Sequence, residues 1–302
     1  MKNIRPRRSA LYLPGSKDRV LEKAKFLAAD VLIFDLEDSV VPEVKPAARQ
    51  AVATALAAGD YGHRELIVRI NEIGSPWGID DLKMALEAGA DGILVPKINT
   101  VADVDAVKAA MVCQFGADGH KRDVSTSRAD LWLMIETPRA VLNIATIAVL
   151  SEDHSYRLRG FVMGTNDLAL ETRADLGEER MALVPWLQTC LIAARGHGLE
   201  ILDGVFNAIG DVAGFVAECQ QGKSLGMDGK TLIHPSQISA ANQNFAPSEE
   251  DVAWSKRVLA AFAKPDAQDV AVLQLEGKMV ERLHIRIAER VVALSEAIIA
   301  TR

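Results

Sequence analysis

Two acidic residues, Glu136 and Asp167, each follow a short apolar run, at residues 131–135 and 160–163. A run of four or five apolar residues without polar alternation is typical of a strand covered on both faces, as in a parallel sheet wrapped by helices. In such folds, ligands bind at the carboxyl ends of the strands. Mg²⁺ usually takes one or two protein carboxylates and completes its shell with water and substrate. We therefore predict that Glu136 and Asp167 bind Mg²⁺.

The elements that must position these acids alternate regularly between strand-like and helix-like segments. Eight βα units within about 235 residues fit a (β/α)₈ TIM barrel, and a doubly wound open sheet is the alternative fold. The strands are expected at residues 9–13, 31–35, 66–69, 92–95, 131–135, 160–163, 200–202 and 229–233. The helices between them are expected at residues 18–28, 46–58, 78–88, 101–115, 141–150, 181–197 and 210–225.

The pattern changes after residue 245, which predicts two domains: a catalytic barrel over residues 1–245 and a C-terminal extension over residues 246–302. Ser248, followed by three acids, is typical of a helix N-cap, and the helix is expected to end near residue 263. A short strand from residue 270 and a helix from residue 280 to the end should follow. We interpret the extension as a lid or an oligomer arm. The polar segment 116–128 is expected to be a surface loop.

The composition excludes several functional classes. The net charge of −7 and pI near 5.5 argue against a nucleic-acid partner, which usually needs a basic face. No run of about 18 apolar residues is present, so neither a membrane partner nor a signal segment is expected, and we predict a cytoplasmic protein. The three cysteines lack metal-binding spacing and are expected to be free thiols.

Six predicted strand ends carry polar groups that a barrel would gather at one face. An isolated carboxylate at a strand end is more often a helix cap or a solvated turn, but six polar ends on one face favour a functional site. They are Pro14-Gly15-Ser16-Lys17, Asp35-Leu36-Glu37-Asp38, Arg69-Ile70-Asn71, Pro96-Lys97, Glu136 and Asp167.

Several sequence blocks resemble the citrate lyase beta subunit and its relatives, the acyl-CoA ester lyases of the HpcH/HpaI aldolase superfamily, which include malyl-CoA and citramalyl-CoA lyases. The resemblance covers nearly the whole chain. It implies a (β/α)₈ barrel with a C-terminal extension, assembled as a homotrimer or as a hexamer. The blocks are residues 8–16, 34–40, 45–49, 68–71, 95–97, 135–137, 164–168, 228–230 and 233–237.

The resemblance also implies roles for individual residues. Glu136 and Asp167 fall on the family's Mg²⁺ ligands, and Arg69 falls on the arginine that grips the carboxylate of a 2-oxo acid. An ion pair of Arg69 with Glu37 or Asp38 is the alternative. Pyruvate-type aldolases of the superfamily commonly carry histidine where this chain has Asp38, which favours the CoA-ester branch. Glu37 and Asp38 are then expected to orient water at the metal and to hold Arg69. A helix N-cap is the alternative for Asp38.

Proton transfer and CoA binding need further residues. In several relatives an aspartate of the C-terminal extension transfers the proton, reaching the site of a neighbouring subunit, and this chain has Glu281 at that position. An acid stabilised at a helix N-terminus is the alternative. The turn Pro14-Gly15-Ser16-Lys17, together with Lys23, is a candidate seat for the CoA diphosphate, unless the lysines only solvate a helix face.

The expected activity is Mg²⁺-dependent cleavage of a malyl-, citramalyl- or citryl-type CoA thioester into a 2-oxo acid and an acyl-CoA. This retro-Claisen reaction places negative charge on oxygen, which a divalent ion stabilises. A malyl-CoA thioesterase, in which water attacks the thioester, is the nearest alternative. A citrate lyase beta subunit that works only with an acyl-carrier protein is another. A non-CoA 2-oxo acid aldolase is disfavoured by Asp38.

Overall fold

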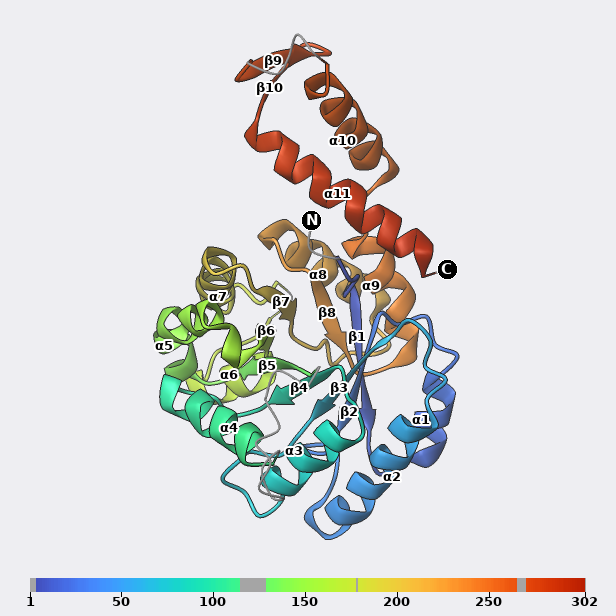
Figure 1. Cartoon of the computed structure of the whole chain (residues 1–302), viewed down its shortest axis with the longest axis vertical. Helices are drawn as coiled ribbons and strands as arrows, with labels where there is room; N and C mark the ends of the chain where they lie inside the picture. Colours follow the sequence, from blue (N-terminus) through green and yellow to red (C-terminus); the bar gives the residue numbers. More distant parts are fainter. Residues whose placement is uncertain (1–3, 115–128, 178, 265–269, 302) are drawn as a thin grey trace. The chain divides into compact units, whose positions relative to one another are not determined.

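The computed structural model describes residues 4–114, 129–177, 179–264 and 270–301. The chain divides into two compact units, Arg7–Asn244 and Phe245–Arg302 with Met1–Pro6 (Figure 1). The expected loop at residues 116–128 lies outside the described residues.

The first unit is a closed barrel of eight parallel strands, in which each strand pairs with the next and β8 pairs with β1. The predicted (β/α)₈ barrel is therefore confirmed, and the open-sheet alternative is wrong. The strands are β1 Ser9–Pro14, β2 Val31–Asp35, β3 Glu65–Arg69, β4 Gly92–Val95, β5 Asp130–Ile135, β6 Leu158–Met163, β7 Glu200–Asp203 and β8 Gly229–Leu232.

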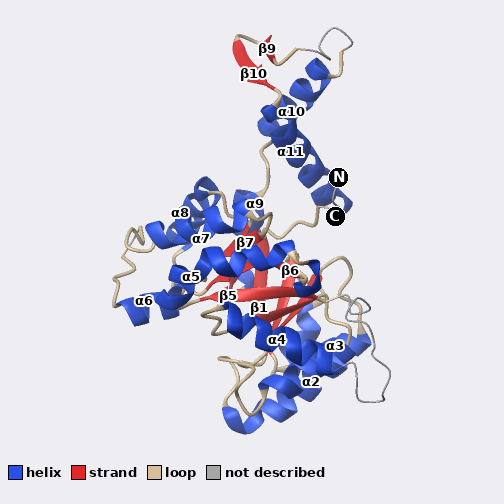
Figure 2. Ribbon diagram, turned by 60° about the vertical axis from the view of Figure 1, so that its left-hand side comes forward, coloured by secondary structure: helices blue, strands red, loops and turns tan. Residues whose placement is uncertain are grey.

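Helices surround the strands on the outside of the barrel (Figure 2). Two short helices were not expected from the sequence, α6 and α9, because each is only eight residues long and polar at several positions. The helices are α1 Asp18–Ala24, α2 Lys45–Ala58, α3 Gly78–Glu87, α4 Val101–Gln114, α5 Pro138–Ala148, α6 Thr165–Thr172, α7 Val184–Gly196, α8 Val212–Leu225 and α9 Ile238–Phe245, with short 3₁₀ turns at Pro42–Val44, Val149–Glu152, His154–Tyr156 and Pro235–Gln237.

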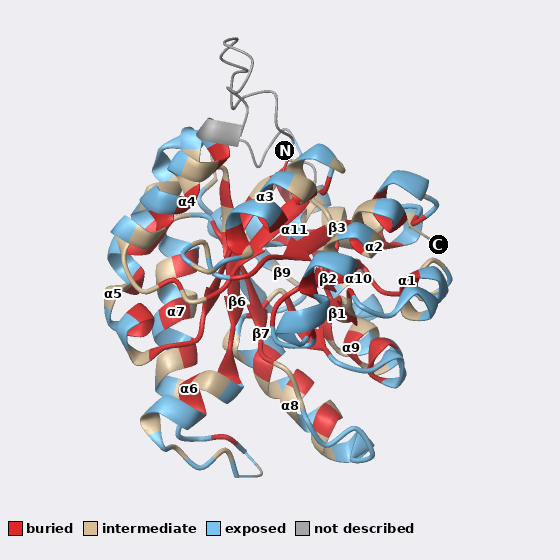
Figure 3. Ribbon diagram, turned by 90° about the horizontal axis from the view of Figure 1, so that it is seen from below, coloured by how far each residue is buried: buried red, intermediate tan, exposed pale blue. Residues whose placement is uncertain are grey.

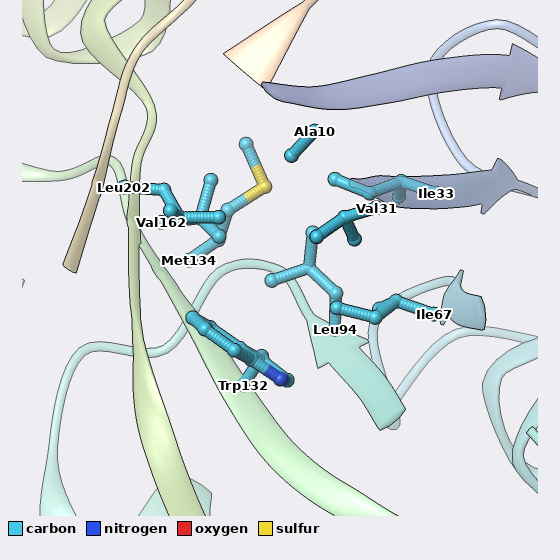
Figure 4. Close-up of a cluster of buried hydrophobic side chains, with 9 residues drawn as sticks. All are labelled: Ala10, Val31, Ile33, Ile67, Leu94, Trp132, Met134, Val162 and Leu202. Atoms are coloured by element: carbon cyan, nitrogen blue, oxygen red, sulfur yellow. The ribbon is translucent and has the colours of Figure 1, made fainter. Parts of the chain in front are cut away.

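The barrel strands are buried and the outer faces of the helices are exposed (Figure 3). Most of the buried side chains are apolar. The interior residues come from different strands and point toward one another (Figure 4). They are Ala10, Val31, Ile33, Ile67, Leu94, Trp132, Met134, Val162 and Leu202, with Tyr12 packed against them. Side chains alternate between the two faces of a strand, so the next inward positions of β2, β3 and β5 are Asp35, Arg69 and Glu136. The apolar core therefore lies directly beneath a polar region at the carboxyl ends of the strands.

The second unit contains α10 Glu249–Phe262, a two-stranded antiparallel sheet of β9 Val272–Leu275 and β10 Lys278–Glu281, and α11 Leu283–Ala300. The expected Ser248 cap is present, since its hydroxyl accepts a hydrogen bond from Asp251 N. The expected helix start at residue 280 is wrong. Glu276 and Gly277 adopt positive φ angles of 48° and 79°, which turn the chain back into a second strand before α11 begins.

None of the helices in the described part of the chain is both long enough and apolar enough to span a membrane.

Candidate active site

A cavity of about 360 Å³ opens at the carboxyl ends of the barrel strands. Its walls come from β1, β2, β3, β5, β6 and β8 and from the segments that follow several of these strands. The lining residues are Tyr12, Pro14, Asp35, Asp38, Ser39, Arg69, Met134, Met163, Gly164, Thr165, Asn166, Asp167, Val205, Asn207, Thr231 and Ile233. Active sites of TIM barrels lie at this face, so the cavity is the candidate active site.

Arg69, the predicted carboxylate-binding residue, lies in this cavity and forms a buried ion pair. Its Nε and Nη2 donate to the two oxygens of Asp35, both at 2.7 Å. Asp35 stands directly opposite Arg69 in the β2–β3 register. Burial alone would raise the pKa of Asp35, but the Arg69 guanidinium and its hydrogen bonds bring it below the usual value. Asp35 therefore takes one edge of the guanidinium, and Nη1 remains for other acidic groups at the cavity.

Glu37 and Asp38 also pair with Arg69, as the alternative interpretation expected. Arg69 Nη1 lies 2.9 Å from Glu37 Oε2 and 3.3 Å from Asp38 Oδ2. The Asp38 side chain is 62 % exposed at the rim, whereas Glu37 is buried. Burial, opposed by the charge of Arg69 and aided by the nearby acids Asp38, Glu136 and Asp35, raises the pKa of Glu37 to about 8. Glu37 therefore carries a proton in much of the ligand-free protein at neutral pH.

The raised pKa of Glu37 predicts a pH-dependent stability. The folded state binds this proton more tightly than the unfolded state, whose glutamate has a pKa near 4.5. The stabilisation is complete below pH 4.5 and is lost as the pH rises through about 8. In Mg²⁺-free buffer, the unfolding free energy of wild type relative to Glu37→Gln should fall between pH 5 and 8, by at most about 1.4 kcal/mol per pH unit.

Denaturant titrations at several pH values check this prediction. Glu43→Gln, at an exposed glutamate a few residues away, is the matched control and should leave the pH profile of wild type unchanged. Parallel profiles for wild type and Glu37→Gln would contradict the assignment of the proton to Glu37.

A buried lysine holds the loop that carries Glu37. Lys45 Nζ donates to the carbonyl oxygens of Leu36 and Glu37 at 2.9 and 2.7 Å and to Asn71 Oδ1 at 2.7 Å. Asn71 Nδ2 in turn donates to Leu36 O and to Asp81 Oδ2. Sequence reasoning did not assign this role to Lys45 or Asn71, although both lie in the blocks that carry the family resemblance.

The two predicted metal ligands lie close to one ammonium group. Lys97 Nζ is 3.2 Å from Asp167 Oδ1 and 3.5 Å from Glu136 Oε1, and Lys97 N donates to the same Glu136 oxygen at 2.6 Å. Lys97 has a φ of 57°, in the left-handed region that costs a non-glycine residue energy, so the backbone is held in an unusual state at this point. The sequence suggested that Asp167 lies in a turn after β6, but it lies in the first turn of α6.

These residues fit a divalent cation. A positive group already sits between the two carboxylates, and the buried Glu136 Oε2 has no hydrogen-bond partner among the described residues. Burial raises the pKa of Glu136 despite the adjacent Lys97, so the carboxylate is poorly compensated without a further cation. Gly164 makes room for Glu136, because a Cβ there would lie 2.3 Å from Glu136 Cβ. Two carboxylates with open positions are the donor set that Mg²⁺ takes.

Only part of the predicted CoA-binding turn lies at the cavity. Pro14 lines it, whereas Ser16, Lys17 and Lys23 are exposed and are not among the lining residues. Gly15 serves packing: its N–H donates to Asp35 O at 2.8 Å, and a Cβ would lie 2.9 Å from that oxygen. Phosphate binding by this turn stays a prediction.

Glu281, the predicted proton-transfer residue, lies at the end of β10 in the second compact unit. Its N–H donates to His284 Nδ1 at 3.0 Å, which fixes the step from β10 into α11. It precedes the first residue of α11 by two positions, so the alternative of a helix N-terminal acid also stays open.

The chain is similar to proteins whose names refer to CoA esters and to a solved structure that contains coenzyme A. The chain is 47% identical over 98% of its length to a (3S)-malyl-CoA thioesterase of Cereibacter sphaeroides, of which it covers 97%. It is 34% identical to an L-malyl-CoA/beta-methylmalyl-CoA lyase of Rhodobacter capsulatus, with 96% of this chain and 94% of the relative aligned. The structure of CitE from Mycobacterium tuberculosis in complex with magnesium, acetoacetate and coenzyme A matches with a TM-score of 0.70 at 27% identity, covering 95% of this chain and 97% of that chain.

The family model matches residues 8–235, which extend from the start of β1 through the last strand of the barrel. This span includes both predicted metal ligands and Arg69. With a barrel of the expected topology and relatives above 30% identity along nearly the whole chain, the protein belongs to the HpcH/HpaI aldolase/citrate lyase family.

Proposed function

We propose that this chain is a Mg²⁺-dependent enzyme that hydrolyses the thioester of a malyl-type CoA ester. The observation that carries the proposal is the carboxylate pair of the buried Glu136 and the half-buried Asp167, already bridged by an ammonium group, beside the cavity that holds Arg69. The 47% identity to a malyl-CoA thioesterase, against 34% to a malyl-CoA lyase over a similar span, supports hydrolysis over carbon–carbon cleavage. The thioesterase, which was the alternative in the sequence analysis, thus becomes the main proposal, and the lyase becomes the alternative.

In the proposed reaction, water adds to the carbonyl carbon of the thioester, the C–S bond breaks, and CoA leaves as the thiol with a proton. The products are the free hydroxy acid and CoA. Glu136 and Asp167 would hold the Mg²⁺, which supplies Lewis-acid stabilisation of negative charge on the ligand's oxygens.

The residues around Arg69 would bind and orient the acid end of the substrate. Arg69 Nη1 faces Glu37 and Asp38, and a ligand carboxylate would meet this nitrogen while Asp35 keeps the rest of the guanidinium in place. Lys97 Nζ lies between the two metal ligands in the ligand-free protein, and it would supply a second positive charge beside them once Mg²⁺ takes that place. The single free carboxylate of a malyl group, with the hydroxyl group beside it, fits a site with these positive groups.

Glu37 is the group best suited to move a proton. Its pKa of about 8 lies near neutral pH, where a general acid–base residue works most effectively. Its Oε2 has no hydrogen-bond partner among the described residues, although it lies 2.9 Å from Arg69 Nη1. Glu37 would therefore donate a proton to, or accept one from, a ligand oxygen beside Arg69.

Carbon–carbon cleavage is the second candidate, because the full-length similarity to an L-malyl-CoA/beta-methylmalyl-CoA lyase spans the same site residues. It would need a proton-transfer group at the enolate carbon, for which Glu281 is the candidate. If the chain instead acts as a subunit that depends on an acyl-carrier protein, it will not turn over CoA esters alone.

Product analysis distinguishes these functions. Purified chain with Mg²⁺ and (3S)-malyl-CoA should release malate and CoA thiol in equal amounts, measured by chromatography and a thiol assay. Glyoxylate together with acetyl-CoA would contradict hydrolysis and establish the lyase. No turnover by the chain alone, with turnover restored by an acyl-carrier partner, would contradict both stand-alone activities.

A further inference from the structure

The hydroxyl group of Tyr12 is buried at the cavity without a partner. Four buried side-chain polar atoms in the described part of the chain lack a hydrogen bond: Tyr12 Oη, Glu37 Oε2, Trp132 Nε1 and Glu136 Oε2. Of these four residues, Tyr12 is the one that lines the cavity. Leaving a hydroxyl buried and unpaired is costly, so an unpaired hydroxyl in a folded protein calls for an explanation, such as a bound water, ion or ligand.

The surroundings of Tyr12 define which partner it can take. Tyr12 follows Ala10 on the inner face of β1, where it packs against the apolar core and also lines the cavity at the carboxyl end of the barrel. The Arg69 guanidinium carbon lies 4.8 Å from the centre of the ring, which places Tyr12 against the proposed carboxylate-binding residue. Burial raises the pKa of the phenol; the Arg69 charge opposes this rise, and the nearby carboxylates of Asp35, Glu136 and Glu37 add to it. The hydroxyl therefore remains a protonated donor.

We infer that Tyr12 Oη donates a hydrogen bond to an oxygen of the acid end of the bound substrate, beside Arg69. This inference rests on the proposed function for the identity of the ligand, a 2-hydroxy acid carried on CoA. It makes Tyr12 a further binding residue, one that an apolar side chain of the same shape could replace in the fold but not in the site.

Tyr61 provides a matched control in the same chain. It is also buried beneath the surface of the barrel, but its hydroxyl donates to the carbonyl oxygen of Leu21 at 3.2 Å, and Tyr61 does not line the cavity. Tyr61→Phe therefore removes a hydrogen bond within the protein, whereas Tyr12→Phe removes none.

The experiment measures two quantities for wild type, Tyr12→Phe and Tyr61→Phe: the melting temperature of the free protein and the Kd of (S)-malate in the presence of Mg²⁺. Tyr12→Phe should melt no lower than wild type and should bind malate about 10- to 100-fold more weakly, as expected for a lost hydrogen bond to a charged group. Tyr61→Phe should melt lower and bind malate as wild type does.

Three results would overturn the inference. An unchanged Kd in Tyr12→Phe, with wild type binding malate normally, overturns it alone and leaves the proposed function standing. A lower melting temperature of free Tyr12→Phe shows that the hydroxyl has its partner within the protein. Failure of wild type to bind malate with Mg²⁺ overturns both the inference and the proposed ligand.

Discussion

Replacing Glu136 with glutamine should lower the turnover of a malyl-type CoA ester by about three orders of magnitude. Glu136 is fully buried, and its Oε2 is free to bind a cation, so the neutral amide removes half of the protein's negative charge at the proposed Mg²⁺ site. Loss of Lewis-acid stabilisation of several kcal/mol corresponds to a change of this size in rate. Steady-state assays of thiol release with saturating Mg²⁺ measure the effect.

The exposed Glu152 supplies the control for Glu136. Glu152→Gln removes the same charge from a side chain that is 67% exposed and pairs only with His197 among the ion pairs of the described residues. It should retain wild-type activity. Full activity in Glu136→Gln, measured beside this control, would contradict the metal assignment.

Removing Arg69 should cost the protein about 3–5 kcal/mol of unfolding free energy. Arg69→Met leaves the Asp35 carboxylate buried without its guanidinium, and breaking one side of a buried pair has a cost of this order. Denaturant unfolding measures the loss. Asp35→Asn combined with Arg69→Met should recover part of it, because the double variant buries no unpaired charge at this position.

Arg8 and Asp30 form a matched pair that separates stability from ligand binding. Arg8 donates to both oxygens of Asp30, at 2.8 and 2.7 Å, and both residues are buried away from the cavity lining. Arg8→Met should lose similar stability but keep malate binding in the folded protein. Arg69→Met should lose both. If Arg69→Met binds malate as tightly as Arg8→Met does, Arg69 serves only the fold.

The barrel was predictable because its strands are covered on both faces. A strand buried on both faces favours a short, mostly apolar run, and all eight expected strands coincide with observed ones to within about two residues at either end. The hairpin in the C-terminal unit was less accessible to this reasoning. Its strands are largely exposed, so their apolar residues form only a weak alternating pattern. The turn between them depends on the positive φ angles of Glu276 and Gly277, which cannot be predicted from composition.

The site was predictable where an acid ends an apolar run, as for Glu136 and Asp167. Its other members depend on tertiary position. Asp35 pairs with Arg69 only because the β2–β3 register places them opposite each other. Tyr12 lies inside the barrel only because its side chain is on the inner face of β1. The role of Lys97 follows from a left-handed backbone after a proline, which the strand pattern does not reveal.

The position of the divalent ion tests the account most directly. Mn²⁺ replaces Mg²⁺ in oxygen-ligand sites and scatters anomalously, so a crystal grown with Mn²⁺ reports where the ion binds. We predict one strong anomalous peak within about 2.0–2.2 Å of a carboxylate oxygen of Glu136 and one of Asp167, with the Lys97 ammonium withdrawn from between them. A peak elsewhere in the barrel, or an active protein that binds no ion at these two residues, would contradict the proposed site.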